Sequence, residues 1–144
     1  MNLPRLLLKS YQRLTGEPLI PGLPAEAEPA AALWDFPAVV VAHDTAEDPC
    51  FMYANRAALD LFEMSREAFI GMPSRFSAEP MQREAREQLL REVCAKGFTR
   101  AYSGVRVSST GRRFRIENAA VWNLVDASGE LHGQAATFSQ WVFV

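Results

Sequence analysis

The chain has 144 residues, of which 49% are hydrophobic and 22% charged, and this composition predicts one globular domain with a sizeable core. A net charge of -2 excludes a general attraction to nucleic acid, and no apolar run is long enough to span a membrane. The two cysteines, Cys50 and Cys94, lie in no disulfide or metal-binding pattern, so a cytoplasmic location is expected.

Residues 1–29 predict an amphipathic helix followed by a proline-rich connection. Apolar residues recur at helical spacing over residues 3–15, and Gly16 ends the pattern. They are Leu3, Leu7, Tyr11 and Leu14. Such a stripe can join two chains, so we expect a homodimer through this helix. The main domain is expected over residues 30–144, beginning with one short helical turn.

The next part of the chain predicts a hairpin and two short helices. Strands are expected near residues 39–41 and 51–53, where β-branched and aromatic residues gather. Asn55 then stands where it can cap the first helix by accepting a hydrogen bond from a free backbone N–H. Ser65 stands in the same relation to the second helix, which is expected to stop near Gly71.

The second half predicts one longer helix and a meander of three strands. The helix is expected from Met81 to Lys96, and its charged residues at intervals of four indicate a solvated outer face. The strands are expected at residues 99–107, 112–125 and 131–143, with turns between them. The fold class is therefore α+β, with a five-stranded antiparallel sheet, helices packed on one face and an additional N-terminal helix.

This order of elements resembles a PAS domain over residues 38–139, through YANRAALDLF at 53–62 and SREAFIG at 65–71. Longer stretches are similar to the MEKHLA domain family: SYQRLTGEPL at 10–19, PSRFSAEP at 73–80, YSGVRVSSTGRRFRIENAAVWNLVD at 102–126 and GQAATFSQW at 133–141. The chain is similar to the free-standing bacterial type. Other members of the family lie at the C-terminus of some plant homeodomain–zipper transcription factors. The resemblance implies a PAS-like sheet and a role in sensing or protein interaction.

Light-sensing flavin-binding PAS domains share an asparagine-cysteine-arginine-phenylalanine motif, which falls here on residues 73–76. Ser74 replaces the reactive cysteine and lacks its thiolate chemistry, while Arg75 matches the arginine that meets the flavin phosphate. Three positions that carry flavin-binding amides hold other residues, namely Arg106, Ile116 and Ala135. No histidine lies between residues 72 and 98, where haem-binding PAS domains usually take their ligand. No cofactor and no metal are therefore expected.

The candidate site is the pocket between the sheet and its covering helices. Strict alternation along the strand 112–125 places one set of side chains on the inner face. They are Phe114, Ile116, Asn118, Ala120, Trp122 and Leu124. On an apolar wall, Asn118 either bonds a neighbouring backbone or contacts a ligand. Tyr53, Arg75 and Arg106 complete the candidate ligand-binding residues, together with Phe114, Ile116, Asn118 and Trp122.

The preceding strand leaves two arrangements open. Alternation favours Val105 and Val107 inside, whereas the count against the flavin domains favours Arg106 inside. A buried arginine would require an anionic ligand or a carboxylate partner, for which Glu79 and Glu117 are candidates.

Three functions remain as hypotheses. The first is a non-catalytic PAS-like domain that binds a small molecule and acts in trans through a protein partner. The second is a docking or dimerisation module whose core is filled by large side chains such as Trp34, Trp122 and Phe114. The third, which has the least support, is a small α+β cone-fold enzyme that uses His43 and Asp44. The acidic loop around Asp44 is more typical of a turn than of a metal site. No nucleic-acid or membrane partner is expected.

Overall fold

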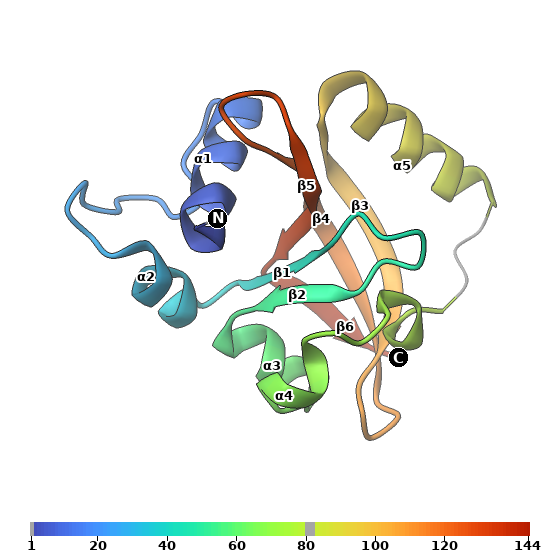
Figure 1. Ribbon diagram of the computed structural model, residues 1–144. Coiled ribbons are helices and arrows are strands. Elements are labelled where there is room, and N and C mark those ends of the chain that lie inside the picture. Colours follow the sequence, from blue (N-terminus) through green and yellow to red (C-terminus); the bar gives the residue numbers. More distant parts are fainter. Residues whose placement is uncertain (1, 80–82) are drawn as a thin grey trace.

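A six-stranded antiparallel sheet forms the centre of the molecule in the computed structural model, which describes residues 2–79 and 83–144 (Figure 1). The strands are β1 (Val39–His43), β2 (Phe51–Ala54), β3 (Phe98–Val107), β4 (Arg113–Val125), β5 (Leu131–Phe138) and β6 (Gln140–Phe143). Their order is β2-β1-β5-β4-β3, and β6 pairs with β4. The long last strand of the sequence prediction is therefore interrupted at Ser139. As a result, β5 and β6 pair with different halves of β4.

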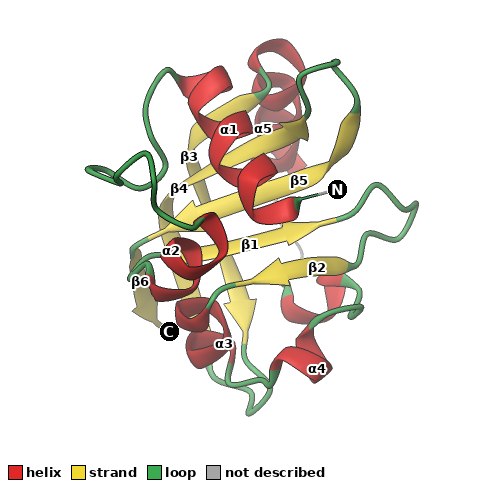
Figure 2. Cartoon of the chain, turned by 60° about the vertical axis from the view of Figure 1, so that its left-hand side comes forward, coloured by secondary structure: helices red, strands yellow, loops and turns green. Residues whose placement is uncertain are grey.

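Helices cover both faces of the sheet (Figure 2). The inner face carries α3 (Arg56–Phe62), α4 (Arg66–Phe69), a 3-10 turn at Ser74–Ser77 and α5 (Arg83–Lys96). The outer face carries α1 (Leu3–Thr15) and α2 (Pro29–Asp35). Helices on one face were expected, and α3 to α5 meet that expectation, whereas α1 and α2 pack on the other side. The expected start of the longest helix at Met81 lies outside the described residues.

The apolar stripe of α1 packs against the sheet of its own chain. Leu6 and Leu7 are buried there with Trp122, whose side chain is fully covered. The indole Nε1–H of Trp122 donates to the Ser10 hydroxyl over 3.0 Å, and the Tyr11 ring meets the indole edge-on at 4.9 Å between centroids. The stripe that led us to expect a homodimer through residues 3–15 is thus already covered. Homodimerisation itself stays a prediction.

A β-bulge at Asn118 changes which side chains of β4 face inward. Ile116 pairs with Gly104 and Ala119 pairs with Tyr102, so β4 contains one more residue than β3 between these pairs. Asn118 takes up this extra residue with a left-handed φ of 52°. The alternation therefore changes phase. The prediction that Phe114, Ile116, Asn118, Ala120, Trp122 and Leu124 share one face is wrong beyond Ile116, and Ala119 and Val121 face inward instead.

Substitution of Asn118 tests the bulge. Asn118→Val should lower the free energy of unfolding by about 1–3 kcal/mol, because a β-branched residue is strained at positive φ. Asn118→Gly should change it by less than about 1 kcal/mol, since glycine adopts this conformation readily. Urea denaturation followed by circular dichroism measures both. Arg115→Val, at an exposed strand position without positive φ, is the matched control. Equal losses for Asn118→Val and the control would contradict the assignment.

Candidate functional site

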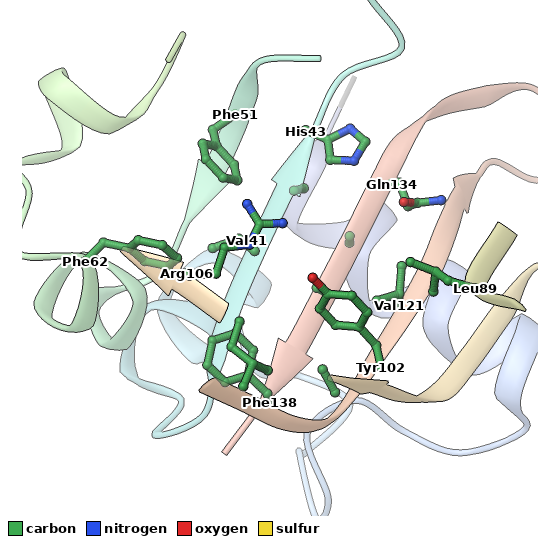
Figure 3. A pocket seen from close by; sticks show the side chains of 15 residues that line it. Val41, His43, Phe51, Phe62, Leu89, Tyr102, Arg106, Val121, Gln134 and Phe138 are labelled. Atoms are coloured by element: carbon green, nitrogen blue, oxygen red, sulfur yellow. The ribbon is translucent and has the colours of Figure 1, made fainter. Parts of the chain in front are cut away.

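A pocket of about 150 Å³ lies between the inner face of the sheet and α5 (Figure 3). Apolar side chains from four strands and two helices form most of its wall. They are Val41, Phe51, Phe62, Leu89, Ile116, Ala119, Val121, Ala136 and Phe138. Four polar side chains, those of His43, Tyr102, Arg106 and Gln134, also line it. The pocket thus combines an apolar wall with a few polar groups, which is typical of small-molecule sites.

Small side chains in the middle of the sheet leave room for this pocket. Ala119 follows the bulge on β4, and Ala136 lies on β5 directly opposite Val121. Without the bulge at Asn118, the inward position would fall on Ala120 and Trp122 instead of Ala119 and Val121. The part of the pocket wall that β4 contributes is therefore set by the conformation of Asn118.

Arg106 points into the pocket from β3 (Figure 3). Its Nη1 donates to the Ser74 backbone carbonyl over 3.1 Å and to the Ser77 hydroxyl over 3.0 Å. This orientation agrees with the count against the flavin domains and contradicts the alternation that favoured Val105 and Val107 inside. The expected carboxylate partners are engaged elsewhere. Glu79 accepts from Arg113 at 2.9 Å, and Glu117 lies 3.5 Å from Arg115.

Tyr102 is a pocket residue that the sequence analysis missed. Its ring lies along β3 over Gly104, where an added Cβ would come within 2.5 Å of the tyrosine hydroxyl oxygen. The hydroxyl points into the pocket and makes no hydrogen bond within residues 2–79 and 83–144 (Figure 3). Tyr102 precedes Arg106 by an even number of residues, so an inward Arg106 would have indicated an inward Tyr102 as well.

The predicted residues of β4 lie in three different environments. Ile116 lines the pocket. Phe114 is fully buried in the inner core beside it, in register with Arg106. Trp122 faces α1 on the opposite side of the sheet. Asn118 is exposed and donates to the Gln140 side chain over 3.2 Å. Among the described residues it therefore neither bonds a buried backbone group nor lines the pocket.

The other two candidates, Tyr53 and Arg75, also lie away from the pocket. Tyr53 packs against the outer core, and burial raises the pKa of its hydroxyl to about 12. Arg75 is exposed, contacts Asp48 at 3.1 Å and lies over the Phe76 ring at 4.5 Å. The structure therefore brings together Arg106 and Ile116 from the predicted set and leaves the other five outside. Ligand binding by any of them stays a prediction.

His43 and Asp44 do not form an acid–base pair. The His43 Nδ1 lies 2.9 Å from the backbone carbonyl of Asp44, rather than its carboxylate. The Asp44 carboxylate instead accepts from the backbone N–H groups of Ala46 and Cys50, at 3.1 and 3.0 Å. This is ordinary turn chemistry. The arrangement gives no support to the enzyme hypothesis.

A second acidic group lies in the turn between β4 and β5, where Asp126, Glu130 and His132 come close enough to hold a metal ion. The hydrogen bond from His132, followed by one from Ser128, lowers the pKa of Asp126. Backbone N–H groups of Ser128 and Glu130 also donate to this carboxylate. Closing the turn is therefore a sufficient explanation for this group of residues.

The strand order and the helices over the inner pocket define a PAS-like domain, and comparison with solved structures agrees. The PAS domain of a protein from Colwellia psychrerythraea aligns with a TM-score of 0.65 at 17% identity, covering 77% of this chain and 92% of that one. The light-state dimer of the fungal blue-light photoreceptor Vivid aligns with a TM-score of 0.64 at 16% identity, covering 97% and 95%. At such low identity the likeness concerns the fold.

The chain belongs to the MEKHLA domain family, whose model matches residues 1–143. It is 29% identical over 150 residues to the homeobox-leucine zipper protein REVOLUTA of Arabidopsis thaliana, covering 100% of this chain and 18% of that protein. It is 28% identical over 147 residues to HOX29 of Oryza sativa subsp. japonica, covering 99% and 17%. The chain thus spans less than a fifth of these relatives. Both are plant proteins and give no support for the expected bacterial type.

The site does not fit a flavin. A pocket of about 150 Å³ is smaller than the roughly 300–1,000 Å³ that drug-sized ligands occupy. Arg75, which would meet the flavin phosphate, is exposed and paired with Asp48. Ser74 offers no thiol, and its backbone carbonyl accepts from Arg106.

Among the described residues, no helix is long and apolar enough to cross a membrane.

Proposed function

We propose that this PAS-like domain senses a small molecule bound in the pocket between the sheet and α5, and that it acts through contacts with a protein partner or a second copy. The pocket itself is the observation that carries the proposal. Its apolar wall provides a place for a compact ligand, and the side chains of Tyr102 and Arg106 extend into it. An apolar cavity of about this size is large enough for one aromatic ring.

Two strands offer a route from the pocket to the outer surface. On β4, Val121 lines the pocket and its neighbour Trp122 packs against α1. On β5, Ala136 and Ala135 are related in the same way, because successive side chains of a strand face opposite sides. A ligand that moves these strands would also move the surface on which α1 rests. This connection supports a sensory role over a docking module with a filled core.

Small one-ring compounds test the proposal. Titration of ¹⁵N-labelled protein with toluene should produce saturable shifts in the amide signals of Tyr102, Val121 and Ala136, because toluene matches the apolar wall. The variant Ala136→Leu fills the pocket and should abolish these shifts while keeping a dispersed spectrum. Ala30→Leu, at an exposed position of α2, is the matched control and should bind as the unmodified protein does.

The absence of binding would contradict the proposal. If neither toluene nor any charged one-ring compound produces saturable shifts in the unmodified protein, the pocket is not a ligand site. The docking module would then be the better explanation of the fold.

A further inference from the structure

The wall of the pocket carries one side chain with a permanent positive charge, that of Arg106. Arg106 is half-buried at its wall, and no acidic side chain is among the lining residues in the described part of the chain. Glu79 and Glu117, the two carboxylate partners expected for Arg106, contact Arg113 and Arg115 instead. A partly buried cation without a carboxylate partner favours an anion at the same place. The ligand should therefore carry a negative charge.

The geometry of Arg106 indicates which anion fits. Both of its contacts, to Ser74 and Ser77, use Nη1, and these two bonds hold the guanidinium in place. The edge formed by Nε and Nη2 makes no hydrogen bond or ion pair with any described residue. Two parallel N–H groups on one edge match the two oxygens of a carboxylate. The Tyr102 hydroxyl also points into the pocket and can donate a third hydrogen bond (Figure 3).

The remaining wall limits the rest of the ligand. Ala119, Val121 and Phe138 present apolar surface, and the volume of about 150 Å³ leaves room for little more than one ring. A polyanion or a nucleotide would place unpaired charge against this surface. A compact apolar body with one charged end satisfies both parts of the pocket.

We propose that the ligand is a small monocarboxylate whose carboxylate binds the Nε–Nη2 edge of Arg106 and whose ring or branched alkyl group fills the apolar end. This inference rests on the proposed function, because it names the ligand class of the same pocket. The polar contacts determine the charge of the ligand, whereas the apolar wall determines its size.

Benzoate and its neutral analogue benzamide separate the two contributions. The protein should bind benzoate at least about 10-fold more tightly than benzamide at pH 7 and low salt, as measured by calorimetry and by the amide shifts of Tyr102. Arg106→Gln should weaken benzoate binding by about 10-fold to 100-fold and leave benzamide binding within about 3-fold. Arg115→Gln removes the same charge from the exposed part of β4 and should leave both affinities nearly unchanged.

A second variant covers the case in which Arg106→Gln disturbs the turn at Ser74–Ser77. Tyr102→Phe keeps Arg106 in place and should weaken benzoate binding by about 3-fold to 10-fold. Equal affinity for benzoate and benzamide, or equal losses in Arg106→Gln and Arg115→Gln, would overturn the assignment of the anion. If toluene and benzamide bind but benzoate does not, the ligand pocket stands and the monocarboxylate is wrong. If none of the three binds, both proposals fail.

Discussion

Replacing Asn55 by alanine is expected to lower the free energy of unfolding by about 4 kcal/mol, because this side chain joins three elements from a fully buried position. Its Oδ1 accepts from the backbone N–H groups of Ala58, at the start of α3, and Val40 on β1, at 3.1 and 3.0 Å. Its amide donates to the carbonyls of Leu33 and Ala38 at 3.1 and 2.8 Å. Alanine would leave these buried groups unsatisfied. Urea denaturation followed by circular dichroism measures the loss.

Ser65 provides the control for this prediction. It caps the neighbouring helix α4 through a single bond from Ala68, at 3.2 Å, and its side chain is exposed. Ser65→Ala should therefore cost only about 1 kcal/mol, the usual value for an N-cap. The difference between the two variants measures what Asn55 contributes beyond capping. Losses of similar size would show that the contacts to α2 and β1 add nothing to stability.

Replacing Trp122 by alanine is expected to lower the free energy of unfolding by about 3–5 kcal/mol, since its side chain is 0% exposed between β4 and α1. The variant loses the packing against Tyr11 and the hydrogen bond to Ser10, and it leaves a cavity under the helix. The transition measured by circular dichroism should shift to lower urea concentration. Amide hydrogen exchange in residues 3–15 should also accelerate, because α1 rests on this residue.

Trp34→Ala is the matched control, because Trp34 is 37% exposed and its ring centroid lies 5.6 Å from the guanidinium carbon of Arg56. Its expected cost is below about 1 kcal/mol. If α1 exchanges no faster in Trp122→Ala than in Trp34→Ala, the helix does not depend on the outer core for its position. The route proposed from the pocket to α1 would then lose its structural basis.

Local patterns predicted most of the helices and strands. Asn55 and Ser65 cap the helices α3 and α4 as expected, accepting from Ala58 and Ala68. The apolar spacing over residues 3–15 coincides with α1. Capping and periodicity depend on neighbours within a few residues, and this is why they can be read without the tertiary structure.

The candidate site was less predictable because it depends on single residues in the middle of strands. A shift of one residue exchanges the two faces of a strand, and Asn118 introduces such a shift through its positive φ. Because of this shift, Trp122 packs on the outer face and Val121 lines the pocket. On β3, the pattern of valines indicated the wrong face for Arg106.

The sequence by itself determined that this chain is a PAS-like domain of the MEKHLA family, because element order, caps and family motifs are all local or collinear features. It also indicated that Arg106, if buried, needs a negative partner. Only the tertiary structure decided that Arg106 faces a pocket whose described lining holds no carboxylate, and that α1 covers the outer face. Both depend on contacts between residues far apart in the chain. Those contacts depend on which side chains of β4 face inward and on which acids pair with which bases. No local sequence pattern predicts either of these.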